Sequence, residues 1–459
     1  MKRKKNPFVI HYGDRMCATF PRKMKKHYLC AINPVNMIRK VYKFGGASVK
    51  DADAVRNLKA IVEQHKNDDI LLVVSAMGKT TNKLEAVLAE FRKHNGQLGF
   101  DALSEVVGFH EDIIVNLFDK ASIDQVVGKV SPLFLELYDK LQETDCDYDY
   151  QYDQTVCYGE LISTTIIATY LNESGVPTRW LDARKYVMTD TNFHSANLDW
   201  DETRVRIQRL LPEHINGIVC LTQGFIGSTT DEKHSTTLGR EGSDFTAAIF
   251  ANCLDAEEVT IWKDVDGLLN ADPKRFADTV KIAHISYSEA IELAFYGATV
   301  IHPKTIKPLQ NKSIRLKIQS FVHPNHEPTL IDGTKTKRQQ IPSYIVKDNQ
   351  TLLSVSPRDY SFMDEWHLQT VFGVCNELKI HANMIQTSAL TLSICFDSDE
   401  TKIRLLVNRL KKAFKVLYNT NLQLFTIRHY KEGTECEYVK GKRILVKQSS
   451  RSTMQFVLG

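Results

Sequence analysis

An apolar strand pattern at Val41–Phe44 ends at the pair Gly45-Gly46, and a helical pattern begins at Asp51. Because glycine has no Cβ, backbone amides near such a pair can approach an anion, and the helix start beyond it adds a partial positive charge. Lys43 lies two residues before the glycines, so its ammonium can reach the same anion. The stretch is a candidate phosphate site, although a plain tight turn looks the same in sequence. It matches neither the Walker A loop nor the dinucleotide-binding glycine motif.

Short apolar runs alternate with helical stretches from Val41 to about Ile331, and this alternation predicts a mostly parallel sheet with helices on both faces. Ligands of such sheets bind beyond the carboxyl ends of the strands, so polar motifs that follow the strands are candidates for a single site. The predicted strands are Val41–Phe44, Ile70–Ser75, Thr178–Asp182, Ile218–Thr222, Glu258–Trp262 and Arg315–Gln319, and the predicted helices include Asp51–His65, Asn82–Lys93, Glu160–Ser174 and Ser286–Phe295.

The loop after the second predicted strand, within Val73–Asn82, is small and polar and contains Ser75. The Ser75 hydroxyl and the loop amides are candidates to face a substrate or a phosphate, while Thr81 or Asn82 could simply cap the next helix. Glu160 opens another predicted helix, where an acid most often serves the helix dipole.

Residues Leu221–Ala248 contain two glycine-rich turns, the second of which leads into an apolar helix. Arg240 lies in that turn and can offer a planar pair of donors to a carboxylate, and Asp244 stands at the helix start. A surface ion pair would give the same pattern. The acids along Trp262–Lys274 suggest a calcium loop, but the loop follows a strand and lacks the Glu that closes such a site, so we expect no calcium there.

The composition limits the class of protein. Of 459 residues, 43% are hydrophobic and 25% are charged, which is typical of a chain with about two or three domains. The net charge of +4 comes from the basic first 40 residues; the remainder is mildly acidic, which argues against a nucleic-acid partner. No run reaches the ~18 apolar residues that span a bilayer, so we expect no membrane partner. Nine scattered cysteines, an odd count without close pairs, fit a reducing cytoplasm and no zinc site.

Taken in this order, the five stretches resemble the aspartokinases of the amino acid kinase superfamily, over about Met37 to Ile331 and more weakly to the end of the chain. Lys-Phe-Gly-Gly-x-Ser-Val at Lys43–Val49 and Gly-Arg-x-Gly-Ser-Asp at Gly239–Asp244 are similar to the most specific signatures of the family, and Phe295–Pro303 is similar to a third. The resemblance implies a three-layer αβα sandwich followed by an ACT-like α+β domain.

The resemblance also implies a reaction, ATP-dependent phosphorylation of the side-chain carboxylate of L-aspartate to 4-phospho-L-aspartate, the first step of lysine, threonine and methionine synthesis. Mg²⁺ is the implied cofactor, and the resemblance assigns no side chain as its ligand. The implied catalytic residues are Lys43 and Asp244, and Asp244 orients Lys43. The residues implied to bind aspartate are Ser75, Glu160 and Arg240. The residues implied to bind ATP are Lys43, Phe44, Gly45, Gly46, Lys263, Asp264, Leu269, Lys274 and Lys281.

Four positions depart from the family pattern. Glu241 replaces a common glycine, Leu269 a Tyr that packs on the nucleotide, Lys274 an Arg, and Thr299 a Lys. None removes the charged residues of the implied site, so we expect an active enzyme.

The pattern after Ile345 predicts strands and helices in βαββαβ order, that of an ACT module, and Val371-Phe372-Gly373 resembles its helix motif. A second module must be much reduced, because about 45 residues follow Phe414. We expect a basic extension at 1–38 that is disordered or precedes a true start at Met37, with a transit peptide as the alternative. The other expected divisions are a kinase domain at 39–331, a linker at 332–345 and an ACT-like domain at 346–459.

Asn383 and Ala389 stand where lysine-sensing family members carry acids. Since a buried amine without a carboxylate is costly, we expect weak or no lysine inhibition. The ACT-like region is expected to form a homodimer, either with an amino-acid effector or as a dimerisation module alone.

Two other functions remain open on the sequence: another kinase of the superfamily, or a non-catalytic amino-acid sensor on the same scaffold. Retention of Lys43, Glu160, Arg240 and Asp244 argues against a sensor. No dinucleotide fingerprint is present, so we expect no fused homoserine dehydrogenase.

Overall fold

The computed structural model describes residues 39–65, 68–93, 96–211, 218–298, 301–334, 341–431 and 437–459. The predicted extension at 1–38 and the departure at Thr299 lie outside these residues. Within them, no helix combines the length and the apolar character that crossing a membrane requires.

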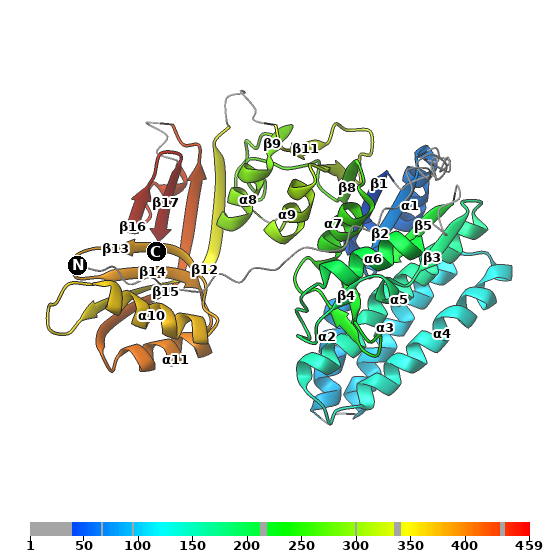
Figure 1. Ribbon diagram of the computed structural model, residues 1–459, viewed down its shortest axis with the longest axis horizontal. Coiled ribbons are helices and arrows are strands. Elements are labelled where there is room, and N and C mark those ends of the chain that lie inside the picture. Colours follow the sequence, from blue (N-terminus) through cyan, green and yellow to red (C-terminus); the bar gives the residue numbers. More distant parts are fainter. Residues whose placement is uncertain are drawn as a thin grey trace, which may run out of the picture. The chain divides into compact units, whose positions relative to one another are not determined.

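A central eight-stranded sheet has the strand order β3-β5-β2-β1-β8-β10-β11-β9 (Figure 1). Its neighbouring strands are parallel except for β10 and β11. All six predicted strands belong to it, which confirms the mostly parallel sheet. The strands are β1 (Lys40–Phe44), β2 (Ile70–Val74), β3 (Thr178–Leu181), β5 (Val219–Gln223), β8 (Glu258–Lys263), β9 (His284–Ser286), β10 (Arg315–Ser320) and β11 (Thr329–Asp332).

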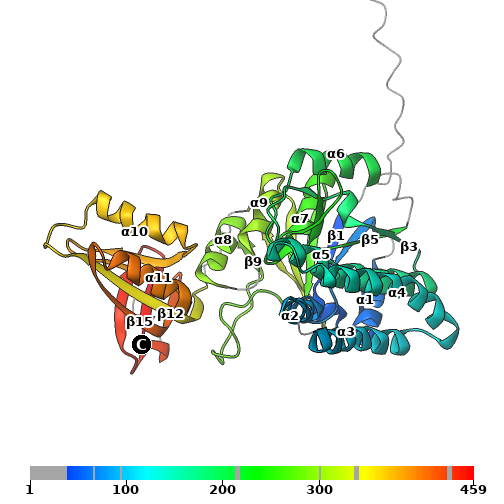
Figure 2. The ribbon, with the colours of Figure 1, turned by 90° about the horizontal axis from the view of Figure 1, so that it is seen from below.

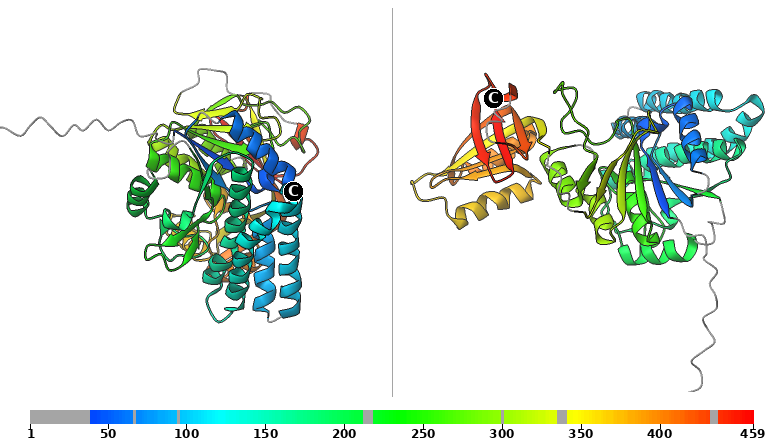
Figure 3. Two further views of the ribbon diagram at one scale, coloured as in Figure 1. Left: turned by 90° about the vertical axis from the view of Figure 1, so that its right-hand side faces the viewer. Right: turned by 90° about the horizontal axis from the view of Figure 1, so that it is seen from above.

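Helices cover both faces of this sheet (Figure 3). Tyr42 and Phe44 of β1 enter one core with α1–α5, whereas Val41 enters a second core with α6–α9. Because successive side chains point to opposite faces and both faces are covered, the central strands are apolar throughout. The helices are α1 (Ala52–Gln64), α2 (Thr80–Arg92), α3 (Gly96–Leu117), α4 (Lys120–Gln142), α5 (Tyr148–Glu173), α6 (Trp200–Leu210), α7 (Gly242–Leu254), α8 (Tyr287–Tyr296) and α9 (Pro303–Asn311).

The start of α5 differs from the prediction. Asp147 caps this helix through the amides of Asp149 and Tyr150, so Glu160 lies in mid-helix and not in its first turn. The helix is buried on nearly all sides and therefore has no amphipathic period that would reveal its first three turns. The prediction that Glu160 opens a helix is wrong, and the helix dipole does not account for its carboxylate.

Three further strands form a small sheet of order β4-β6-β7. They are β4 (Met188–Thr189), β6 (Ile226–Thr229) and β7 (Ser235–Thr237). Since β6 follows β5 directly and β7 precedes α7, this sheet connects two of the motifs found in the sequence.

The C-terminal domain has one antiparallel sheet of order β13-β14-β12-β15-β17-β16. Two helices, α10 (Glu365–Glu377) and α11 (Glu400–Leu410), pack with its first strands in a shared core (Figures 1 and 2). The βαββαβ order matches the ACT-like prediction. The strands are β12 (Ser343–Pro357), β13 (Ala382–Thr387), β14 (Leu392–Asp397), β15 (Phe414–Arg428), β16 (Ile444–Ser449) and β17 (Thr453–Leu458).

Both long strands of this sheet, β12 and β15, extend past the ACT-like unit. The amino-terminal part of β12 begins at Ser343, inside the predicted linker, and pairs with the end of β15, which in turn pairs with β17. These strands with β16 form a second sheet half, and no α-helix occurs in it among the described residues after β15.

Candidate functional site

A cleft of about 700 Å³ lies at the carboxyl ends of the central strands. It brings together residues from all five sequence stretches, as expected for motifs that follow parallel strands. Its lining comprises Lys43, Gly46, Ser75, Ala76, Gly78, Thr81, Asn82, Tyr152, Glu160, His194, Ser195, Phe225, Gly239, Arg240, Glu241, Gly242, Ser243, Asp244 and Lys263.

The two loops that follow β1 and β2 are in direct contact. The amide of Gly78 donates to the carbonyl of Gly46 at 3.0 Å, and the amide of Ser75 donates to the carbonyl of Phe44 at 3.1 Å. A Cβ on Gly46 would lie 2.4 Å from the Gly78 carbonyl oxygen. Only glycine therefore permits this approach, so the close packing of the two loops in the cleft wall requires glycine at position 46.

Lys43, Asp244 and Lys263 form a buried ionic cluster. Lys43 Nζ lies 2.6 Å from Asp244 Oδ1, and Lys263 Nζ lies 3.7 Å from Asp244 Oδ2. Burial would raise the pKa of Asp244, but the two ammonium groups outweigh it and hold the pKa below its usual value. The cluster thus carries a carboxylate that fixes two cations, with net positive charge facing the cleft.

Glu160 is the second buried carboxyl group of the cleft. Its Oε1 accepts a hydrogen bond from the amide of Ala76 at 3.3 Å, and its Oε2 is buried with no hydrogen-bond partner in the part of the chain that the structure describes. Burial raises the pKa of Glu160 to about 8, although the Ala76 amide partly offsets it. A buried acceptor without a donor is suited to an incoming cationic group.

Arg240 is exposed at the edge of the cleft, between two residues with left-handed backbone. Gly239 has φ +72° and Glu241 has φ +54°. Their turn leads into α7, so that Arg240 and Asp244 both line the cleft.

Four of the predicted nucleotide residues lie outside the cleft lining, in the segment after β8. Asp264 and Lys274 are exposed, and Leu269 pairs with Lys281 through an isolated β-bridge. Lys281 donates to the backbone carbonyl of Glu327. Lys263, the last residue of β8, lines the cleft and precedes this segment. Phe44 and Gly45 also lie outside the cleft lining: Phe44 is buried in the hydrophobic core, and Gly45 adjoins Gly46.

Several lining residues were not singled out from the sequence. Thr81, Phe225 and Ser243 lie within or beside quoted motifs, so their positions could have been found there. Tyr152 and His194 carried no motif. The ring of His194 stacks on Tyr152 with centroids 4.0 Å apart, and the His194 amide donates to Asp153 at 3.0 Å.

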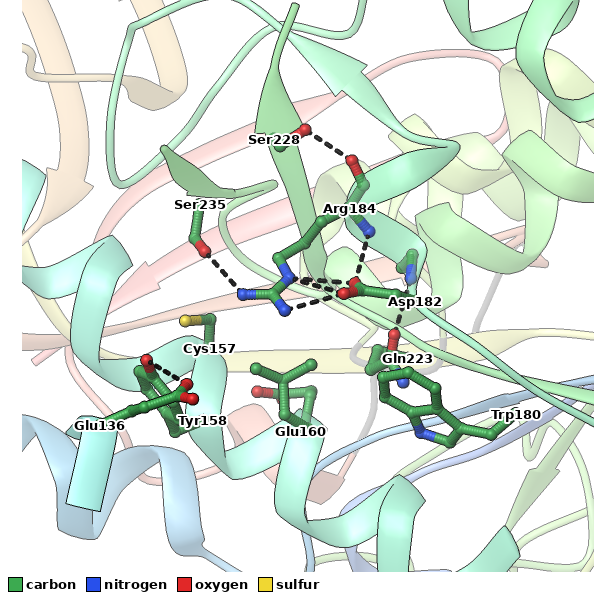
Figure 4. A network of polar contacts seen from close by, with 12 residues as sticks. Glu136, Cys157, Tyr158, Glu160, Trp180, Asp182, Arg184, Gln223, Ser228 and Ser235 are labelled. Atoms are coloured by element: carbon green, nitrogen blue, oxygen red, sulfur yellow. Dashed lines mark hydrogen bonds and ion pairs between the residues drawn. The ribbon is translucent and has the colours of Figure 1, made fainter. Parts of the chain in front are cut away.

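A polar network supports the cleft wall behind Glu160 (Figure 4). The guanidinium of Arg184 pairs with Asp182 at 2.8 Å and donates to the Ser235 hydroxyl at 3.4 Å. The Ser228 hydroxyl donates to the Arg184 carbonyl at 2.6 Å, and the Ala183 amide donates to Gln223 at 2.7 Å. These bonds fix the segment after β3 to β5, β6 and β7.

The cleft suits Mg²⁺ only when phosphate oxygens accompany it. Its charged carboxylate, Asp244, is already held by two lysines, and no cluster of three metal-ligating side chains lies in the cleft among the described residues. Mg²⁺ commonly binds through substrate phosphates and few protein ligands, so these residues fit an ion that arrives with a nucleotide.

Comparison with known proteins places these features in a family. The model of the amino acid kinase family matches residues 39–320. Lysine-sensitive aspartokinase 3 of Escherichia coli (strain K12) is 32% identical over 361 residues, which are 78% of this chain and 78% of that protein. The crystal structure of E. coli aspartokinase III with aspartate and ADP has a TM-score of 0.78 at 27% identity, covering 91% of this chain and 96% of that one.

A longer plant protein matches over much the same region. The chloroplastic bifunctional aspartokinase/homoserine dehydrogenase 1 of Arabidopsis thaliana is 28% identical over 390 residues, or 82% of this chain. The chain spans only 42% of the length of that relative.

Proposed function

The chain belongs to the aspartokinases of the amino acid kinase family, and from this premise we propose that it transfers the γ-phosphoryl group of ATP to the side-chain carboxylate of L-aspartate, giving 4-phospho-L-aspartate. The observation that carries the proposal is the meeting, in one cleft, of the Lys43–Asp244–Lys263 cluster with Glu160 and Arg240.

The phosphate side of the proposal uses the cluster. The nucleophile is a carboxylate that is already ionised at neutral pH, so the reaction needs positioning and charge neutralisation and no general base. Lys43, held by Asp244, neutralises charge that develops on the transferred group, and the amides at Gly45 and Gly46 donate to its oxygens. Mg²⁺ bound by the ATP phosphates supplies further positive charge.

The amino-acid side of the proposal uses the opposite charges of a zwitterion. Glu160 receives the ammonium of aspartate, Arg240 receives its α-carboxylate through a bidentate contact, and Ser75 adds a hydrogen bond. The β8–β9 loop, with Asp264, Leu269, Lys274 and Lys281, binds the nucleoside part of ATP. The product enters the synthesis of lysine, threonine and methionine. The enzyme acts in the cytoplasm as a homodimer that is joined through the ACT-like region.

ATP turnover in the presence of hydroxylamine tests this function, because hydroxylamine traps an acyl phosphate as a hydroxamate. We expect hydroxamate with L-aspartate and little with L-glutamate or N-acetyl-L-glutamate. Hydroxamate formation that is fastest with either of the other two amino acids would assign the chain to another reaction of the superfamily.

A further inference from the structure

The geometry points to a binding site for a divalent transition-metal ion of the Zn²⁺ class at Asp266, His323 and His326, outside the cleft. Asp266 lies in the loop after β8, and the two histidines lie in the loop after β10. Asp266 lies in the same loop as the residues that the proposed function assigns to ATP, but the three ligands are none of the residues assigned to the kinase reaction.

The ligand atoms of the three side chains lie close to the separations that a metal requires. Their ligand atoms all lie within 4.8 Å of one another. His323 Nδ1 is 3.1 Å from Asp266 Oδ1, and His326 Nδ1 is 3.6 Å from Asp266 Oδ2. Ligands of a tetrahedral zinc ion, at about 2.0–2.2 Å from the metal, lie roughly 3.3–3.6 Å from each other. A metal ion can therefore be accommodated with small side-chain movements.

The donor atoms of these three side chains favour one class of metal ion. Two imidazoles and one carboxylate are ligands of Zn²⁺, Co²⁺ and Ni²⁺, whereas Mg²⁺ and Ca²⁺ prefer oxygen ligands alone. The side chains are about half exposed, at 45% for Asp266, 53% for His323 and 54% for His326, which leaves room for water at a fourth position. The imidazole rings stack with centroids 4.6 Å apart.

Both loops are held in place by their own hydrogen bonds. The His323 amide donates to the Ser320 hydroxyl at 3.1 Å, and the His326 amide donates to the His323 carbonyl at 3.0 Å. On the other loop, the Leu268 amide donates to Thr329 Oγ1 at 2.9 Å, which ties the segment around Asp266 to the start of β11. The backbone segments that carry the three ligands are therefore held in place without a metal.

The site connects the β8–β9 loop with the β10–β11 loop. Asp266 is two residues from Asp264, and Lys281 donates to the carbonyl of Glu327, next to His326. A bound ion would fasten the β8–β9 loop to the β10–β11 loop and stabilise the folded chain by mass action.

Zinc binding by the full-length protein tests the inference. Metal-free protein is titrated with Zn²⁺ against a chromophoric chelator, and with Co²⁺ to record its visible absorption. The variants are Asp266→Asn, His323→Gln and His326→Gln, and the control is His381→Gln, another exposed histidine. We expect one equivalent of Zn²⁺ to be bound by the wild type and the control, and affinity roughly tenfold or more weaker in each of the three variants.

Thermal unfolding with and without Zn²⁺ supplies a second readout that does not depend on activity. The inference predicts that Zn²⁺ raises the unfolding temperature of the wild type and of His381→Gln but not of His326→Gln, whose metal-free unfolding temperature stays at the wild-type value. Equal zinc affinity in all four variants, or no zinc bound by the wild type, would overturn it.

Discussion

Asp244 and Glu160 are both buried carboxyl groups of one cleft, yet their surroundings shift their pKa values in opposite directions. Two ammonium groups keep Asp244 charged, whereas burial without a cation favours the neutral form of Glu160. Such opposite shifts are typical of functional sites, because each group is matched to its task. Asp244 holds Lys43 and Lys263, and the neutral Glu160 suits the binding of a cation, as the proposed function requires.

The first prediction concerns the pH dependence of aspartate binding. The pKa of Glu160 is raised from its ordinary value of 4.5 to about 8, and an aspartate ammonium favours the charged form, so binding releases a proton. KM for L-aspartate should fall as pH rises towards about 8 and then level off, provided that the ammonium stays charged. The KM–pH profile of the wild type measures this, and Glu160→Gln, where any activity remains, should have a flatter profile. A wild-type KM that is independent of pH in this range would contradict the assignment.

The same group lowers stability as pH rises. The unfolded Glu160 loses its proton near 4.5 and the folded one near 8, so the folded state binds more protons between these values. The contribution of Glu160 to the free energy of unfolding is therefore fully present below pH 4.5 and is lost as pH rises through about 8.

The second prediction concerns Glu241. Its φ of +54° costs a non-glycine residue about 1 kcal/mol, and its Oε2 is buried without a hydrogen-bond partner in the described chain. Glu241→Gly should raise the free energy of unfolding by up to about 1 kcal/mol, because glycine relieves the backbone strain at this position. The higher entropy of glycine in the unfolded chain partly offsets this stabilisation. Denaturant unfolding measures the change. A loss of stability would show that the Glu241 side chain makes a favourable contact.

Among the secondary-structure elements, the strand–glycine–helix unit was predictable and the start of α5 was not. The unit at β1 has local signals, namely an apolar run, two glycines and the cap Asp51. The helix α5 lacks an amphipathic period because it is buried on nearly all sides. Likewise, Ser75, Arg240 and Asp244 belong to motifs, whereas Tyr152 and His194 reach the cleft through tertiary packing that no local pattern records.

The third prediction tests the contact between the loops after β1 and β2. Gly46→Ala places a Cβ 2.4 Å from a backbone oxygen, so the loops must separate, which costs about 1–3 kcal/mol. The separation also moves the backbone amides that the proposed function assigns to the phosphate. We expect a lower unfolding temperature and a higher KM for ATP. The matched control is Gly108→Ala in α3, where a Cβ meets nothing within 4 Å and helix propensity predicts a gain of about 0.5–1 kcal/mol. Equal behaviour of the two variants would contradict the close approach.

For the whole molecule, the sequence predicted the order of the elements and the residues of the cleft better than it predicted regulation. The parallel sheet and the βαββαβ domain follow from periodicity and are confirmed. The expectation about lysine rests on the surroundings of Asn383, where β12, β13 and β14 meet, and these surroundings require coordinates. There Asn383 accepts from Lys347 Nζ at 2.9 Å and donates to Gln350 at 2.8 Å and to Asp397 at 2.9 Å.

The fourth prediction follows from this arrangement. The ammonium of Lys347 already contacts Asn383, so a free lysine would meet a like charge there. Activity titrated with L-lysine should therefore show little inhibition, with lysine-sensitive E. coli aspartokinase 3 as the positive control. The double variant Asn383→Asp, Ala389→Glu should gain sensitivity. Strong inhibition of the wild type by sub-millimolar lysine would refute the prediction.

Aspartate-dependent ADP formation by Lys43→Ala tests the central claim most directly. The control is Lys59→Ala, which removes a lysine of α1 that pairs with Glu63 and does not line the cleft, and it should keep wild-type turnover. Loss of the cation that faces the transferred phosphate should lower kcat roughly 100-fold or more in a chain that still unfolds cooperatively. Wild-type turnover by Lys43→Ala would contradict the claim that this cleft performs phosphoryl transfer.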